Sequence, residues 1–153
     1  MAAGRKEPLE RALAALNHRE RSVAELTRWL LERDYELEEV DAAISELIEL
    51  GALDDERFAR LFAEDKRELA GWGPERIEAA LRERGLDSRL IAAVCAVDDH
   101  AAQVERAAGL LTARNAPLGG EAERGRALGF LARRGYDYEV AYEAIRSTAP
   151  EAA

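Results

Sequence analysis

The chain has 153 residues, of which 48% are hydrophobic, 6% aromatic and 35% charged, and its formal net charge is −9. This composition is typical of a soluble, helix-rich protein, and no apolar run approaches the ~20 residues that cross a bilayer. The acidity argues against a general DNA-binding protein, because sequence-independent affinity for DNA comes from neutralising phosphates, and it favours a protein partner.

The acidic excess lies in the first two thirds of the chain. Residues 1–53 carry 7 basic and 12 acidic side chains, residues 54–100 carry 8 and 12, and residues 101–153 carry 7 and 7. The charge therefore does not exclude a local contact between nucleic acid and arginines of the last third. The single cysteine, Cys95, excludes an internal disulfide, and no apolar core follows the charged N-terminus, so we expect a cytoplasmic protein.

Apolar residues at helical spacing predict three helices in the first 50 residues or so. The first begins at Pro8. The second opens at Ser22, which forms a capping-box pattern with Glu25 three residues later. The third carries its apolar stripe from Leu37 to Ile48 and is closed by Gly51.

The same pattern returns in the middle of the chain, where we predict helices at 54–69, 74–84 and 87–97. Asp54 and Asp55 are suited to cap the first of these helices, and Pro74 to begin the second. The apolar stripe of the first helix is formed by Phe58, Leu61, Phe62 and Leu69.

A third set of helices is predicted at 98–114, 121–134 and 137–147, with a loop at 115–120. Aligning the three sets at a spacing of about 50 residues gives three columns. They are Leu30, Leu81 and Leu131; Arg33, Arg84 and Arg134; and Tyr35, Leu86 and Tyr136.

The predicted fold is all-α, with three tandem three-helix repeats that form an elongated, curved array. We place an N-terminal tail at 1–8, repeats at 9–53, 54–97 and 98–147, and a C-terminal tail at 148–153. Because each repeat is too small to bury a good core alone, we expect most side-to-side contacts to lie between adjacent repeats.

Two blocks in the middle of the chain carry a specific pattern. They run Gly51-x-Leu53-Asp54-Asp55-x-Arg57-Phe58-Ala59-Arg60 and Gly71-Trp72-Gly73-Pro74-x-Arg76-Ile77, followed by x-Leu81-x-x-x-Gly85-Leu86. Weaker flanking features are Arg21-Ser22-x-x-Glu25-Leu26 and Phe130-Leu131-x-x-Arg134-Gly135-Tyr136. Together they resemble the RecX family from about Leu9 to Ile145, with Asp34 at an expected glycine and Ala52 at an expected aromatic.

The resemblance implies three tandem three-helix repeats and a regulator that is not an enzyme. It implies a protein that binds the RecA–DNA filament and inhibits the ATPase, strand-exchange and co-protease activities of RecA, and so modulates recombination, DNA repair and the SOS response. We expect a monomer without a small-molecule substrate.

Eleven arginines and one tryptophan are the candidate contact residues. For the RecA filament we single out Arg57, Arg60, Arg67, Trp72, Arg76, Arg82 and Arg84. For nucleic acid in the filament we single out Arg114, Arg124, Arg126, Arg133 and Arg134. The alternative for each arginine is a solvated helix face with local ion pairs, each of which contributes little.

The alternative function is a direct DNA-binding module of helix-turn-helix type, in which 124–134 would be the recognition helix. His18 and His100 lack ligands at metal-binding spacing, and no convergent catalytic groups are evident, so we expect no metal, no cofactor and no enzyme. For Trp29 and Cys95 a packing role is favoured.

Overall fold

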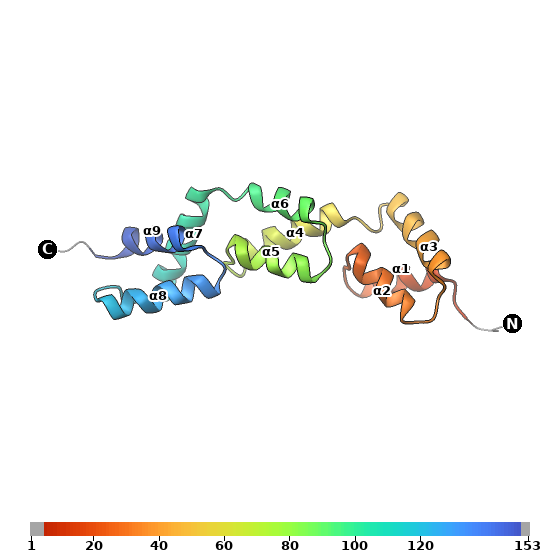
Figure 1. Ribbon diagram of the computed structural model, residues 1–153, viewed down its shortest axis with the longest axis horizontal. Coiled ribbons are helices and arrows are strands. Elements are labelled where there is room, and N and C mark those ends of the chain that lie inside the picture. The colour runs from red at the N-terminus through yellow and green to blue at the C-terminus, as the bar shows by residue number, and fades with distance from the viewer. Residues whose placement is uncertain (1–4, 151–153) are drawn as a thin grey trace.

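The computed structural model describes residues 5–150, and that part of the chain contains nine α-helices and no strand. Unit 1 consists of α1 (Pro8–His18), α2 (Val23–Leu31) and α3 (Leu37–Glu49). Unit 2 consists of α4 (Asp55–Glu68), α5 (Pro74–Glu83) and α6 (Ser88–Ala96), and unit 3 of α7 (His100–Ala113), α8 (Glu121–Arg133) and α9 (Tyr138–Thr148). Figure 1 shows the units in an extended row, with unit 1 at one end and unit 3 at the other.

This arrangement confirms the prediction of an all-α array of helical repeats. Parts of the predicted terminal tails, residues 1–4 and 151–153, lie outside the described residues. Within residues 5–150 no helix is long and apolar enough to span a bilayer.

Local signals set the helix ends. The Ser22 hydroxyl accepts a hydrogen bond from the Glu25 amide at 3.1 Å, and the Glu25 carboxylate accepts one from the Ser22 amide at 3.0 Å. The first turns of α4, α6, α7 and α9 are each capped by an aspartate side chain. These carboxylates satisfy amides that have no partner inside their helices.

The second helix of every unit ends in the same way. A residue in the left-handed region follows it, with φ of 65° at Asp34, 82° at Gly85 and 101° at Gly135. Asp34 occupies this conformation without glycine's freedom, as short polar residues sometimes do. The next residue along, from the predicted column Tyr35, Leu86 and Tyr136, is buried in each case.

Buried residues form three separate clusters, one in each unit. The predicted leucine column, Leu30, Leu81 and Leu131, is fully buried, one leucine in each cluster. Extensive helix–helix packing occurs only within units, where the first and third helices pack together and the second packs on the third.

The expectation that most side-to-side contacts lie between repeats is therefore wrong. The reason is the small size of many core residues, because buried alanines allow the short helices of one unit to approach closely and enclose their own core. These alanines include Ala12, Ala59, Ala63, Ala107 and Ala144.

Leu69 is a second correction, since we predicted it on the apolar stripe of α4. The helix ends at Glu68, and Leu69 is 84% exposed. Gly71 then turns the chain with φ of 66°, and the Trp72 amide donates to the carbonyl oxygen of Lys66 at 2.9 Å. Trp72 therefore covers this end of the core of unit 2.

The units are joined at the ends of their second helices, which follow one another along the lower side of the array in Figure 1. Where α8 meets α5, the Gly73 amide donates to the carbonyl oxygen of Arg134 at 2.8 Å, and the Glu75 amide donates to that of Gly135 at 3.0 Å. The Tyr136 hydroxyl also donates to the Gly71 carbonyl at 2.8 Å.

The junction between α5 and α2 uses the equivalent surfaces. The Ser22 hydroxyl donates to the carbonyl oxygen of Arg84 at 2.6 Å, and the Arg84 guanidinium pairs with Glu25 at 3.0 Å. In both junctions the carbonyl end of one helix faces the amide end of another, an arrangement that satisfies orphan backbone groups and aligns the helix dipoles.

We predict that Gly73→Ala opens the junction between units 2 and 3. A Cβ at residue 73 would lie 2.5 Å from the Gly135 carbonyl oxygen and 2.8 Å from the Tyr136 nitrogen, both backbone atoms that cannot move independently. The free energy of unfolding, from urea titrations followed by circular dichroism, should fall by roughly 1–3 kcal/mol.

Gly109→Ala is the matched control, since no atom lies within 4 Å of a Cβ at this position in α7. Because alanine is the better helix former, this change should raise the free energy of unfolding by roughly 0.5–1 kcal/mol. Equal effects of the two substitutions would contradict the close approach of the helix ends.

Candidate partner-binding surface

Several of the predicted contact arginines lie at the junctions. The Arg84 guanidinium pairs with Glu25 and lies 4.7 Å from the centre of the Phe58 ring. Arg76 donates to the carbonyl oxygen of Arg133 at 3.3 Å and stacks on Trp72 at 4.2 Å. These guanidinium groups connect one unit to the next.

Two further arginines of α4 bind carbonyl oxygens. Arg57 donates to the carbonyl oxygen of Gly51 at 3.1 Å. Arg67 donates to that of Val94 at 2.6 Å, and its side chain is only 12% exposed. Arg67 is therefore part of the interior of unit 2 and not of a solvated helix face.

Three of the arginines predicted to face nucleic acid are also engaged within the protein. Arg134 donates to the carbonyl oxygen of Ala70 at 3.0 Å, across the junction with unit 2. Arg124 donates to that of Leu118 at 3.0 Å, and Arg114 stacks 4.0 Å from the centre of the Phe130 ring.

Seven of the predicted contact arginines are exposed, and three of them, Arg76, Arg114 and Arg124, make the contacts described above. The other four are Arg60, Arg82, Arg126 and Arg133. No hydrogen bond or salt bridge of their guanidinium groups occurs within residues 5–150. Arg60 borders a hollow of about 270 Å³ between α4 and α6, whose apolar lining includes Leu90, Val94 and Val97. Arg126 borders a hollow of about 190 Å³ beside Phe130. The structure does not bring all twelve predicted residues onto one surface.

Trp72, the remaining predicted contact residue, is half-buried. Its ring packs edge-on against Phe62 at 6.3 Å, with Lys66 4.7 Å and Arg76 4.2 Å from its centre. Trp29 is also half-buried, against the core of unit 1, with the Arg33 guanidinium 3.7 Å from its ring. Cys95 is buried as predicted, and burial raises the pKa of its thiol.

A buried aspartate organises the junction of units 2 and 3. The Asp98 side chain is 2% exposed, and its carboxylate accepts two hydrogen bonds from Arg106, at 2.7 and 3.0 Å. Arg67 approaches the same carboxylate at 3.6 Å. Arg106 also donates to the Tyr136 hydroxyl at 2.9 Å, which links the carboxylate to the bond between Tyr136 and Gly71.

The pKa values in this network follow from burial and pairing. Burial alone would lower the pKa of Arg106, but the hydrogen bond to Asp98 and nearby negative charge outweigh it and raise that pKa. Burial raises the pKa of the Tyr136 hydroxyl, which therefore stays protonated and donates at neutral pH.

Sequence reasoning missed this network. The helix predicted at 98–114 starts with two aspartates, Asp98 and Asp99, but only Asp99 caps α7, by accepting from the Ala102 amide at 2.8 Å. Asp98 turns inward. No short-range pattern indicated the pair, because Asp98 and Arg106 are eight residues apart, and side chains on one helix are neighbours at a spacing of three or four.

The junction of units 1 and 2 contains a similar reassignment. Asp54 caps its own helix as predicted, by accepting from the Arg57 amide at 3.0 Å. Asp55 instead accepts from the Val23 amide of α2 at 2.8 Å, and burial raises the pKa of the Asp55 carboxyl. For Glu25, burial opposes ionisation, but hydrogen bonds from Arg84 and the Ser22 amide leave its pKa below the ordinary value.

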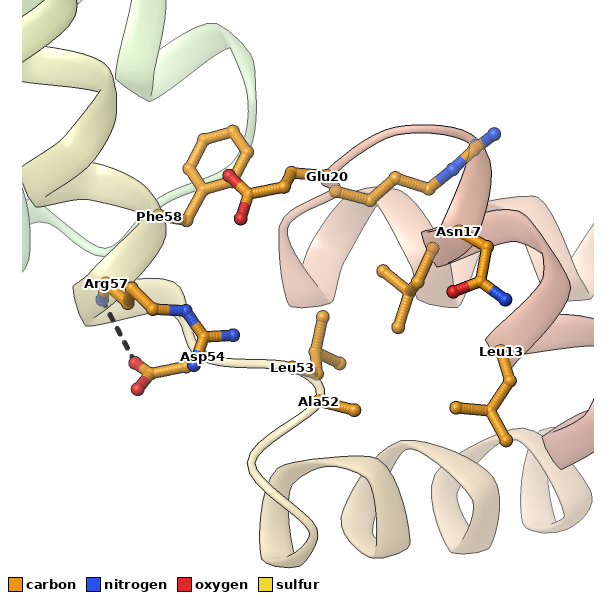
Figure 2. Close-up of a pocket in the computed structure, with 10 residues that line it drawn as sticks. Leu13, Asn17, Glu20, Ala52, Leu53, Asp54, Arg57 and Phe58 are labelled. Atoms are coloured by element: carbon orange, nitrogen blue, oxygen red, sulfur yellow. Dashed lines mark hydrogen bonds between the residues drawn. The ribbon is translucent and has the colours of Figure 1, made fainter.

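Figure 2 shows a hollow of about 270 Å³ between units 1 and 2. Leu13 and Asn17 line it from α1, and Leu53, Arg57 and Phe58 from the connection and α4. Its walls contain no serine, cysteine, histidine or lysine. Among residues 5–150 no group of three or more histidine, cysteine or acidic side chains is placed to hold a metal ion.

Comparison with known proteins assigns the family. Residues 9–47 match the family model for the RecX first three-helix domain, and residues 54–94 that for the RecX second three-helix domain. A regulatory protein RecX from Stenotrophomonas maltophilia (strain R551-3) is 40% identical over 142 residues, covering 91% of this chain and 85% of the relative. The chain belongs to the RecX family.

Other RecX proteins extend this similarity. A regulatory protein RecX from Mycolicibacterium smegmatis is 34% identical over 140 residues, covering 87% of this chain and 74% of the relative. The crystal structure of RecX from Lactobacillus salivarius has a TM-score of 0.82 at 19% identity, covering 92% of this chain and 94% of that one. The structural similarity therefore includes the third unit, and it shows the fold.

We predict that Asp98→Asn destabilises this RecX protein strongly. It would leave the Arg67 and Arg106 guanidinium groups, 12% and 18% exposed, without their carboxylate. The free energy of unfolding in urea should fall by roughly 3–5 kcal/mol, because an uncompensated buried charge is costly.

Glu105→Gln, at an exposed position of α7, removes the same charge outside the network. It should change the free energy of unfolding by less than about 0.5 kcal/mol. A similarly small effect of Asp98→Asn would show that the network does not hold units 2 and 3 together.

Proposed function

We propose that this RecX-family protein binds the RecA–DNA filament and inhibits the ATPase, strand-exchange and co-protease activities of RecA. In this role it modulates recombination, DNA repair and the SOS response. It acts as a monomeric regulator in the cytoplasm, without a cofactor, a small-molecule substrate or catalysis of its own. Membership of a family of regulatory proteins supports the proposal.

The observation that carries the proposal is the end-to-end connection of the three units. Backbone hydrogen bonds at 2.8 and 3.0 Å join α8 to α5, and the Arg84–Glu25 pair joins α5 to α2. An extended body of this kind can contact several successive protomers of a protein polymer. Individually weak contacts then act together, because the first one raises the effective concentration of the others.

Two classes of arginine follow from the contacts inside the chain. The exposed Arg60 and Arg82 are the proposed contacts to RecA, together with the half-buried Trp72. The exposed Arg126 and Arg133 are the proposed contacts to nucleic acid in the filament. Of the remaining predicted arginines, Arg76, Arg84 and Arg134 would act by joining adjacent units. The others would stabilise local structure: Arg57, Arg67, Arg114 and Arg124.

Direct DNA binding through α8 is the weaker candidate. Arg124 and Arg134 of the suggested recognition helix already donate to the Leu118 and Ala70 carbonyl oxygens. Only Arg126 and Arg133 are then free to contact DNA, on a protein with a net charge of −9. Two arginines supply little of the counterion release on which sequence-independent affinity depends.

We predict that the double substitution Arg60→Glu, Arg82→Glu weakens inhibition of RecA. The experiment measures ATP hydrolysis by preformed RecA filaments on single-stranded DNA against the concentration of this protein. The half-inhibitory concentration should rise about tenfold or more, because two favourable contacts become repulsive.

Arg19→Glu, Arg28→Glu is the matched control, with the same change in charge at exposed positions of unit 1. It should leave the half-inhibitory concentration nearly unchanged. No inhibition by the unchanged protein at any stoichiometry would overturn the proposed function. Tight, steeply salt-dependent binding to duplex DNA without RecA would favour the DNA-binding alternative.

A further inference from the structure

The two ends of the array present the same two kinds of surface that join its units. Inside the array, the C-terminal end of α8 contacts the N-terminal end of α5, and the C-terminal end of α5 contacts the N-terminal end of α2. One C-terminal end has no described unit before it, namely residues 33–35 after α2 (the α2 end). One N-terminal end has no described unit after it, namely residues 118–123 at the start of α8 (the α8 end).

Residues 5–6 cover the α2 end with contacts that imitate those of a preceding unit. Arg5 Nη2 donates to the carbonyl oxygen of Asp34 at 2.6 Å, and the Tyr35 hydroxyl donates to that of Lys6 at 2.6 Å. Unit 3 makes the equivalent bonds to unit 2. The carbonyl oxygen of Gly135, its left-handed residue, accepts from the Glu75 amide, and the Tyr136 hydroxyl donates to the Gly71 carbonyl oxygen. The Arg5 guanidinium also stacks on the Tyr35 ring at 4.3 Å.

The two ends carry complementary charges at equivalent places. Glu123 is the third residue of α8, as Glu25 is the third residue of α2, and Glu25 is paired with Arg84. Arg33 is the residue of unit 1 that aligns with Arg84 of unit 2 in the repeat. Within residues 5–150, neither Arg33 nor Glu123 forms a salt bridge.

We infer that a second copy of this chain docks its α8 end on the α2 end of the first, with Arg33 paired to Glu123. In this arrangement the α2–α5–α8 row continues from one molecule into the next. The contact joins two different surfaces, so it repeats and gives open chains of molecules and not a closed dimer.

Residues 5–6 act as a plug against this assembly. They are held by the bonds to Asp34 and Tyr35 and by an ion pair of Arg5 with Glu39 at 3.9 Å, but all of residues 5–7 are exposed, so little buried apolar surface holds them in place. Their attachment to α1 nevertheless keeps them at high effective concentration beside the α2 end. The unchanged chain is therefore a monomer in dilute solution, and displacement of the plug releases association.

The groups already bonded at the α8 end are compatible with docking. The Glu123 carboxylate accepts from the Gly120 amide at 3.2 Å. Glu25 shows that such a carboxylate can cap its own helix and still pair with an arginine of another unit. Arg124, which binds the Leu118 carbonyl oxygen, is on the protein surface and can turn aside.

Sedimentation velocity of the full chain, without RecA or DNA, tests the inference over a series of protein concentrations. With Arg5→Ala, the sedimentation coefficient should rise with concentration, and the apparent dissociation constant should be about tenfold lower than for the unchanged chain. Arg5 is an exposed residue outside every helix, so its removal leaves the three cores intact.

Charge reversal identifies the surfaces involved. In the Arg5→Ala background, Arg33→Glu or Glu123→Arg should each return the protein to a concentration-independent monomer, and an equimolar mixture of the two should associate again. Glu105→Arg, on the exposed face of α7, should leave association unchanged. An Arg5→Ala protein that stays monomeric at every concentration, or associates regardless of residues 33 and 123, would overturn the inference.

Discussion

The structure depends on one arrangement, in which the carbonyl end of a helix meets the amide end of another. A helix of about ten residues leaves four amides and four carbonyls without internal partners, a large fraction of its backbone. Here the Gly73 and Glu75 amides at the start of α5 donate to the carbonyl oxygens of Arg134 and Gly135, directly after α8. The Ser22 hydroxyl, which caps α2, donates to the carbonyl oxygen of Arg84, directly after α5. Groups that would otherwise need water thus become the connections between units.

The contacts of the charged residues depend on these connections between helix ends. Arg84 and Arg134 occupy the same column, yet Arg84 binds a carboxylate and Arg134 a carbonyl oxygen. The difference lies in the partner helix, whose third residue is Glu25 in α2 and Arg76 in α5. An arginine column in a repeat protein can therefore reflect a repeated place at a junction, and its exposed neighbours, such as Arg82 and Arg133, are better candidates for external contacts.

The sequence alone was sufficient for features that depend on neighbours in the chain. The capping box at Ser22, the turn at Gly85 and the buried leucine column all follow from spacings of a few residues or from the repeat, and the structure has them. Contacts between distant segments were not predictable in this way. Asp55 looked like a cap for its own helix, and nothing near it in the sequence indicates that its carboxylate bonds to the Val23 amide.

Hydrogen exchange at the junction of units 2 and 3 tests the account most directly. Gly73 and Glu75 lie at the start of α5, where amides normally exchange fast, but here they donate to the Arg134 and Gly135 carbonyl oxygens. The account predicts that both amides exchange as slowly as those inside α5. They should also exchange far more slowly than the amide of Ala122, which is the second residue of α8 as Glu75 is of α5. If Gly73 and Glu75 exchange as fast as Ala122, the helix ends are not joined, and the three units do not form one body.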